Sequence, residues 1–443
     1  MKLFKRILLL LVLIIAGIVI LNYPKLNIIS GFASKNMASS TFISERSISS
    51  ITTIDHDVPM IKLAATKKVE NGAIASVYGL MERKSICKPG LGCVLITDDF
   101  DESSFNFDPN RTTYINDSLP FPYGTNGVKD TLFKNVDYTR IKTAIEGAFA
   151  NPEIQKTRTL LIAYKGQIIG EQYAKGFSAK TPILGWSMTK SVLATLYGIL
   201  EHEGKINLNN PAPVDSWKND DRKDITINHL LRMQSSLAWE EDYSGISDVT
   251  KMLFLDKDMT VAQEQKEAIA KPTELWNYSS GTSNLLSGIL RDQFKTHQEY
   301  LDFPYMALID RIGMSSMLIE ADMSGNYVGS SYGWANTRDW AKFGILYLNK
   351  GNWNGDQLFD ASWVDYVSTP TALSEGTYGG HFWLNAEGIY PDVPEDLYSA
   401  NGFQGQYVFV IPSKDLVVVR TGLAENPEFD VNTFLSEVVK AIN

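Results

Sequence analysis

Two predicted strand pairs lie far apart in the sequence, and they constrain the fold more than any other feature. Residues 159–164 and 167–173 are strand-forming segments joined by a tight turn, and residues 406–411 and 416–420 repeat this pattern near the other end of the chain. Two distant hairpins can join into one antiparallel sheet. We therefore expect an α+β fold in which helices flank an antiparallel sheet and a mostly helical lobe lies beside it.

Helical spacing of apolar residues marks the segments around and between these strands. It predicts helices at residues 138–150, 191–200, 225–233, 337–348 and 430–442. The second of them is apolar on nearly all sides, which is typical of a helix buried in a protein core. The third begins after Thr226, a residue type favoured at helix N-caps.

Ser187 and Lys190 are three residues apart at the start of the apolar helix, so both side chains project from one helix face. A serine hydroxyl is a weak nucleophile at neutral pH and needs a nearby base. A lysine can be that base when burial lowers the pKa of its ammonium group. The first helical turn also offers N–H groups and a positive dipole to an oxyanion. The pair therefore indicates an acyl-transfer enzyme. A second match to this spacing, Ser85 with Lys88, precedes Pro89, which argues against a helix there.

Two later segments extend this pair into a candidate site. Tyr278 stands in a polar loop between apolar flanks, where its phenol could reach Ser187 and Lys190. We expect the neighbouring ammonium to favour the ionised phenol, which could then relay protons. Residues 399–406 form a Gly-rich entry into the penultimate strand, and we expect Gly402 to let a substrate approach closely.

Ser187-Met-Thr-Lys190, Tyr278-Ser-Ser280 and the Gly-rich segment occur in an order that resembles the class C β-lactamase / penicillin-binding-protein-like serine hydrolases. That group includes D-alanyl-D-alanine peptidases, esterases and 6-aminohexanoate oligomer hydrolases. The resemblance covers residues 137–443 and implies a β-lactamase/transpeptidase-like fold. It implies that Ser187 is the acylated nucleophile and that Lys190 and Tyr278 share the proton transfers. It also implies an oxyanion hole made by the backbone N–H groups of Ser187 and Phe403.

The sequence departs from this family at two positions of the site. The family's Tyr-x-Asn is Tyr278-Ser279-Ser280 here, so Ser280 offers a hydroxyl where the family offers an amide to the substrate. Where β-lactamases carry Lys-Thr-Gly, this chain has Ala400-Asn401-Gly402, and the cation that pairs with a β-lactam carboxylate is missing. Such a loss weakens binding by roughly 2–3 kcal/mol when the contact is desolvated.

These departures favour a serine hydrolase that acts through an acyl-enzyme on ester or linear amide substrates. Two alternatives remain open. One is a β-lactamase or D-alanyl-D-alanine carboxypeptidase acting on cell-wall peptides, and the other is an inactive binding module of the same fold.

A competing hydrolase pattern lies between the second and third motifs. The sequence around Ser331 matches the Gly-x-Ser-x-Gly nucleophile elbow, and His381 with Asp339 or Asp365 would complete an α/β-hydrolase triad. The elbow requires a hydrophobic strand before it, whereas residues 320–326 are polar. We therefore interpret this match as a surface loop.

Composition excludes several other kinds of site. The net charge is −10 and no basic run occurs beyond the N-terminus, so we expect no nucleic-acid partner. The remaining histidines lack metal-ligand spacing, so we expect no metal ion and no other cofactor. The expected partner is a small ester or amide molecule, and the oligomeric state stays undetermined.

The N-terminus carries basic residues before an apolar run at residues 7–21. This pattern is typical of a secretory signal or a signal anchor. We expect a single-pass anchor in the cytoplasmic membrane, with the N-terminus inside and the enzyme facing the periplasm or cell exterior; secretion after signal cleavage is the alternative. Residues 1–22 would be the anchor or signal, residues 23–136 an N-terminal extension that begins as a linker, and residues 137–443 the hydrolase domain.

Cys87 and Cys93 agree with export. The segment between them contains one Pro and two Gly, which permit a tight reversal that brings the sulfurs together. In an oxidising compartment such a pair usually forms a disulfide. Two thiols without a neighbouring histidine are too few ligands for a metal site, and two free thiols remain the other possibility.

Overall fold

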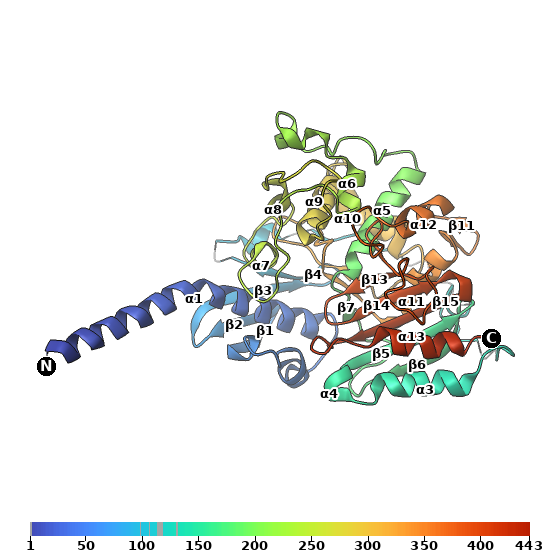
Figure 1. The fold of residues 1–443 in the computed structure, drawn as a ribbon, viewed down its shortest axis with the longest axis horizontal. Coiled ribbons are helices and arrows are strands. Elements are labelled where there is room, and N and C mark those ends of the chain that lie inside the picture. Colours follow the sequence, from blue (N-terminus) through green and yellow to red (C-terminus); the bar gives the residue numbers. More distant parts are fainter. Residues whose placement is uncertain (1, 98, 106, 113–117, 130–131) are drawn as a thin grey trace.

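A six-stranded antiparallel sheet is the centre of the computed structural model, which describes all residues except 1, 98, 106, 113–117 and 130–131 (Figure 1). Its strand order is β12-β13-β14-β15-β5-β6. The strands are β5 (Thr157–Tyr164), β6 (Gln167–Tyr173), β12 (Trp383–Leu384), β13 (Tyr398–Gly402), β14 (Gln406–Ile411) and β15 (Leu416–Gly422). The last long strand, β15, pairs directly with the first, β5, so the two distant hairpins do join into one sheet.

Helices cover both faces of this sheet. α3 (Tyr138–Phe149) and α13 (Val431–Lys440) pack together on one face, and α5 (Met188–His202) and α11 (Thr337–Leu348) cover the other (Figure 1). Side chains alternate along β15 accordingly: Val418 lies in the core with α3 and α13, whereas Val417 and Val419 lie in the larger core with α5 and α11. This two-sided burial explains why β15 begins with four consecutive apolar residues, Leu416–Val419.

A short helix, α4 (Pro152–Gln155), follows α3, and most of the other helices form a lobe beside the α5 face. They are α6 (Ile227–Leu231), α7 (Asp248–Phe254), α8 (Val261–Glu264), α9 (Ser280–Arg291), α10 (His297–Pro304) and α12 (Ala361–Ser368). Short strands complete it: β7 (Ile183–Leu184), β8 (Leu318–Ile319), β9 (Gly333–Ala335), β10 (Asn352–Trp353) and β11 (Asp356–Gln357). The predicted α+β fold of the β-lactamase/transpeptidase type is thus confirmed, as is the Thr226 cap, whose side chain accepts a hydrogen bond from the N–H of His229.

The N-terminal part of the chain adds a long helix and a second sheet. α1 (Lys2–Phe42) runs into the body of the molecule along a four-stranded antiparallel sheet, and α2 (Ile48–Ser50) follows it (Figure 1). The strands of that sheet are β1 (Ala64–Val69), β2 (Gly72–Val77), β3 (Leu80–Lys88) and β4 (Gly92–Ile96). The predicted disulfide between Cys87 and Cys93 is confirmed, and it closes the β3–β4 hairpin.

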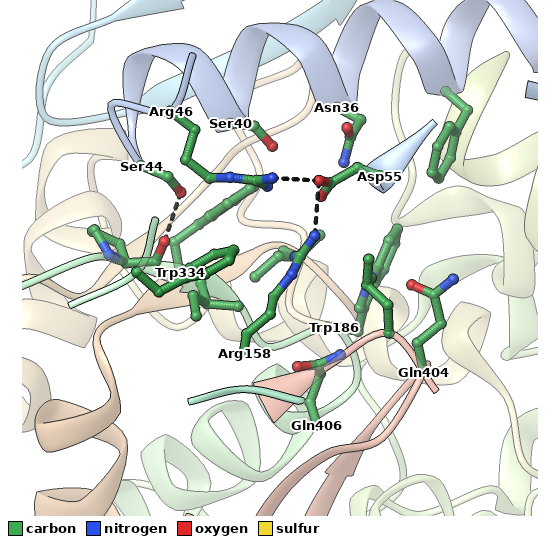
Figure 2. Close-up of a pocket in the computed structure, with 16 residues that line it drawn as sticks. Asn36, Ser40, Ser44, Arg46, Asp55, Arg158, Trp186, Trp334, Gln404 and Gln406 are labelled. Atoms are coloured by element: carbon green, nitrogen blue, oxygen red, sulfur yellow. Dashed lines mark hydrogen bonds and ion pairs between the residues drawn. The ribbon is translucent and has the colours of Figure 1, made fainter. Parts of the chain in front are cut away.

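Two buried ion-pair sites attach α1 and the segment after it to the rest of the molecule. On α1, the Lys35 ammonium lies 2.5 Å from the fully buried carboxylate of Glu320. Beyond α1, Asp55 lies between the guanidinium groups of Arg46 and Arg158, at 2.6 and 2.8 Å (Figure 2). Burial acts to raise the pKa of Asp55, but the two guanidinium groups outweigh it and hold that pKa below its usual value.

One prediction for the N-terminus differs from the structure, and a second is not supported by it. Residues 23–42 are not a linker, because α1 continues without interruption through Phe42. The helix persists there because its small polar residues are buried against the β1–β4 sheet: the Ser34 hydroxyl bonds to the Ala73 carbonyl at 3.0 Å. Within the described part of the chain, no helix combines the length and hydropathy needed to cross a membrane. The expected single-pass span therefore has no support from the structure.

Candidate active site

Ser187 occupies the N-cap of α5, and its hydroxyl is not used for capping. An N-cap serine ordinarily accepts a hydrogen bond from the first helical turn, but no such bond forms here. The Ser187 Oγ lies instead 3.0 Å from the Lys190 Nζ. The preceding residue, Trp186, has a φ of 47°, a conformation that costs energy for a residue with a bulky side chain. Backbone strain next to a hydroxyl that does not cap its helix is typical of an active site.

Lys190 is almost fully buried, with 1% of its surface exposed. Its Nζ lies 2.9 Å from both the Ser280 Oγ and the Ser330 carbonyl oxygen, in addition to its contact with Ser187. Burial lowers the pKa of Lys190 to about 8, and the negative charge of Glu241 opposes part of this decrease. A lysine with this pKa is partly unprotonated near neutral pH and can therefore accept a proton from Ser187.

Tyr278 precedes α9, whose start is fixed by the Ser279 side chain accepting a hydrogen bond from the N–H of Thr282 at 2.9 Å. The Tyr278 ring lies with its centroid 4.9 Å from the Lys190 Nζ. Burial and the charge of Glu241 raise the pKa of Tyr278, against a smaller opposing effect of a hydrogen bond with Ser187. The expectation that the Tyr278 phenol is ionised is therefore wrong, because its pKa is raised and not lowered. Desolvation favours the neutral phenol, so Tyr278 has a proton that it can donate.

Glu241 was not identified from the sequence. One carboxylate oxygen accepts hydrogen bonds from the Ser280 N–H at 2.9 Å and the Trp239 indole at 2.5 Å. The other accepts from the Ser280 hydroxyl and from the Tyr243 hydroxyl, the latter at 2.9 Å. Ser280, expected to contact the substrate, is fully buried and connects Lys190 to this carboxylate. One of two consecutive glutamates thus reaches the site, and no local pattern distinguishes it from Glu240.

The third motif reaches the nucleophile through the end of β13. A Cβ atom on Gly402 would lie 2.0 Å from the carbonyl oxygen of Gly185, so this glycine permits close packing of β13 against the segment before Ser187. The lack of a side chain at Gly402 therefore lets two backbone segments pack closely, whereas the sequence led us to expect room for a substrate. The next residue, Phe403, lies beside the nucleophile, with its ring 5.9 Å from the Trp186 ring.

Ala400, which stands where β-lactamases carry a lysine, is completely buried in the largest apolar core. It pairs with Val408 across the sheet, and both side chains face the α5 side. A lysine at this position would place its ammonium against apolar side chains.

The competing nucleophile elbow is not assembled. Ser331 is buried and its hydroxyl bonds to the neighbouring Ser330 hydroxyl at 2.9 Å. His381 bonds through its two ring nitrogens to the Ser283 hydroxyl and the Leu231 carbonyl.

Neither of the two carboxylates proposed for that triad is hydrogen-bonded to His381. The Asp339 carboxylate accepts hydrogen bonds from Ser316 and pairs with Lys342, and Asp365 is exposed on α12. Burial lowers the pKa of His381 to about 3, with a smaller contribution from the charge of Lys190. His381 therefore stays neutral.

Comparison with known proteins agrees with this geometry. The sequence profile of the Beta-lactamase family matches residues 144–433, which include Ser187, Lys190, Tyr278 and Phe403. The chain belongs to the Beta-lactamase family. Members of this family with this arrangement are serine hydrolases, so the chain is a serine hydrolase of the β-lactamase-related type.

Individual members of the Beta-lactamase family resemble the chain at low sequence identity. A 6-aminohexanoate-dimer hydrolase of Paenarthrobacter ureafaciens is 20% identical over 61% of this chain and 74% of its own length. A solved structure of a proposed 6-aminohexanoate-dimer hydrolase from Bacillus anthracis superimposes with a TM-score of 0.58 at 20% identity, covering 67% of this chain and 81% of that one. A family VIII carboxylesterase gives a TM-score of 0.51 at 15% identity, with coverages of 71% and 98%.

Proposed function

We propose that this member of the Beta-lactamase family hydrolyses esters or linear amides through an acyl-enzyme formed on Ser187. The observation that carries the proposal is the buried Lys190, which lies 3.0 Å from the Ser187 hydroxyl and whose pKa is lowered to about 8. A serine with such a base beside it can attack a carbonyl carbon at neutral pH.

In the first step, Lys190 accepts the Ser187 proton while the Ser187 Oγ forms a bond to the substrate carbonyl carbon. The carbonyl oxygen becomes an oxyanion, which the N–H groups of Ser187 and Phe403 would stabilise. Among the described residues, neither of these N–H groups donates to another backbone carbonyl, so both are available. The positive end of the α5 dipole adds to this stabilisation.

In the second step, the bond between the carbonyl carbon and the leaving oxygen or nitrogen breaks. The neutral Tyr278 phenol is suited to give that atom a proton, and the proton held on Lys190 can restore the phenol. Water then attacks the acyl-enzyme with Lys190 as base, which releases a carboxylic acid and regenerates Ser187. Glu241 supports both steps because it holds Ser280 against Lys190.

The preference for esters and linear amides rests on the third motif. The buried Ala400 offers no cation to a β-lactam carboxylate, and a buried ionic contact of this kind contributes roughly 2–3 kcal/mol to binding. The resemblance to a 6-aminohexanoate-dimer hydrolase and to a carboxylesterase supports the same substrate types.

The test combines labelling with kinetics. A fluorophosphonate probe should modify Ser187, located by mass spectrometry of peptides, and p-nitrophenyl acetate should be hydrolysed with a burst of p-nitrophenol. A fluorescent penicillin should label the protein slowly. Rapid turnover of penicillin, at rates that match the ester, would instead assign the chain to the β-lactamase or carboxypeptidase activity.

We further propose that the enzyme acts outside the cytoplasm and that its N-terminal segment holds it at a membrane, with residues 137–443 as the hydrolase domain. The disulfide and the exposed apolar side chains of residues 7–14 support this. Fractionation of cells with a carbonate wash, N-terminal sequencing and thiol alkylation test it. A soluble cytoplasmic protein with two reactive thiols would contradict the proposal, and a processed N-terminus would replace attachment by secretion.

A further inference from the structure

An apolar cavity of about 370 Å³ adjoins the candidate active site. This volume lies within the roughly 300–1,000 Å³ that is usual for small-molecule pockets. One wall is α1, through Ile28, Ile29 and Phe32, and the facing wall includes Trp186 and Phe403. The cavity therefore joins the N-terminal helix to the two residues that border the proposed oxyanion hole.

Aromatic rings connect these two walls. The Phe32 ring of α1 stacks on the Trp186 ring with centroids 6.4 Å apart, and the Trp186 ring meets the Phe403 ring edge-on at 5.9 Å. The Tyr243 ring stacks on Phe403 at 5.3 Å. Trp186, Phe403 and Tyr243 all keep part of their surface exposed, although large aromatic side chains are usually well buried. Apolar surface thus remains uncovered beside the nucleophile.

The α1 wall is a fixed part of the site. Further along α1, Lys35 pairs with the buried Glu320, and the Ser39 hydroxyl donates to the same carboxylate at 2.7 Å. The indole of Trp334, from β9, also donates to Glu320, at 2.7 Å. These contacts hold the helix at a set distance from Trp186, so the cavity is present before any ligand binds.

The position of Tyr278 decides which part of a substrate the cavity receives. The leaving group must lie against the proton donor, and the Tyr278 ring packs against Tyr378 and Trp383. None of these three residues lines the cavity, whereas the residue before the nucleophile, Trp186, and the oxyanion-hole residue Phe403 do. The cavity consequently lies on the acyl side of the scissile bond.

We infer that the substrate carries an apolar acyl chain of medium length, which lies in this cavity against α1. The inference rests on the proposed function, because it concerns the acyl group that Ser187 would accept. Each methylene buried in an apolar pocket is worth about 0.8 kcal/mol, or about a fourfold increase in kcat/KM. Four added methylenes, from butanoyl to octanoyl, should then raise kcat/KM by about 250-fold.

The experiment measures kcat/KM of the full-length protein for p-nitrophenyl acetate, butanoate, hexanoate and octanoate below their micellar concentrations. An alcohol series, from ethyl to octyl acetate, runs beside it. Ile28→Trp places a large ring in the cavity from the α1 side. Leu80→Trp is the matched control, because Leu80 is an exposed apolar residue at the start of β3 that does not line the cavity. Fluorophosphonate labelling of Ser187 verifies that each variant has a formed active site.

We expect kcat/KM to rise with acyl length in the wild type and in Leu80→Trp, and the octanoate-to-acetate ratio to fall at least tenfold in Ile28→Trp. Hydrolysis of acetate without a preference for longer acyl chains would overturn the inference and leave the proposed function intact. A preference that follows the alcohol, or an unchanged ratio in a labelled Ile28→Trp, would also overturn it. Absence of both ester hydrolysis and labelling would overturn the proposed function together with the inference.

Discussion

Replacement of Glu241 by glutamine removes one negative charge from the active site while the hydrogen-bond network can persist. The amide oxygen of the new side chain can accept from the Ser280 N–H and the Trp239 indole, as one carboxylate oxygen now does. The amide nitrogen can donate to the hydroxyls of Ser280 and Tyr243, both of which can also accept hydrogen bonds. Glu241→Gln therefore tests the charge with little change in shape.

The expected effect follows from the position of Glu241 one hydroxyl away from Lys190. Two unit charges about 5 Å apart interact by about 3 kcal/mol at an effective dielectric constant of 20. Because Glu241 is partly exposed, solvent screening leaves about one pKa unit of this effect. Glu241 raises the pKa of Lys190, so its removal lowers that pKa from about 8. More Lys190 is then unprotonated at pH 7, and kcat/KM there should rise about fivefold.

The assay is the pH dependence of kcat/KM for p-nitrophenyl butanoate between pH 5 and 10. In the wild type, activity should rise with pH and level off above about 8, where Lys190 has lost its proton. In Glu241→Gln the rise in kcat/KM should occur about one pH unit lower. Glu240→Gln, at the exposed neighbouring carboxylate, is the matched control and should leave the profile in place. An acid limb that stays fixed or moves to higher pH in Glu241→Gln would refute Lys190 as the base that this charge controls.

Three further predictions concern the site and the core. Ser187→Ala should abolish ester hydrolysis and fluorophosphonate labelling, whereas Ser331→Ala, whose hydroxyl bonds to Ser330, should retain both; the reverse pattern would exclude the proposed nucleophile. Tyr278→Phe should lower kcat by roughly two to four orders of magnitude in stopped-flow assays, the usual span for a lost general acid, and a loss of less than tenfold would contradict that role. Ala400→Lys should lower the free energy of unfolding by about 3 kcal/mol in urea titrations, because it buries an unpaired ammonium, and unchanged stability would show that position 400 is open to solvent.

The catalytic pair and the main sheet could be predicted because their signals are local. Ser187 and Lys190 are one helical turn apart at the start of an apolar helix, and this spacing alone brings their side chains together. Residues 407–411 of β14 and residues 416–419 of β15 are apolar, and the union of these strands with β5 and β6 in one sheet follows from joining two hairpins. The roles of the site residues stay predictions, because their test is kinetic.

Other parts of the site depend on contacts between distant segments. Residues 30–41 are rich in Ser, Ala and Asn, which is typical of a linker, yet they form a helix that is buried against the β1–β4 sheet and pairs through Lys35 with Glu320, 285 residues away in sequence. The direction of the Tyr278 pKa shift was missed for a related reason. The sequence indicated the neighbouring ammonium but not the burial of the phenol or the charge of Glu241, and these two effects dominate.

The attachment of α1 sets a limit on how the chain can be shortened for laboratory production. A cut just before the family match at residue 144 would follow the sequence boundary, and it would remove Lys35 and Ser39 from Glu320. The glutamate would then lose the cation and the hydroxyl that it bonds to on α1. The same cut would remove Phe32 from the Trp186 ring and expose an aromatic surface prone to aggregation beside the nucleophile. A shortened enzyme that is meant to keep its native selectivity should therefore begin before Lys25, the first cavity residue of the helix.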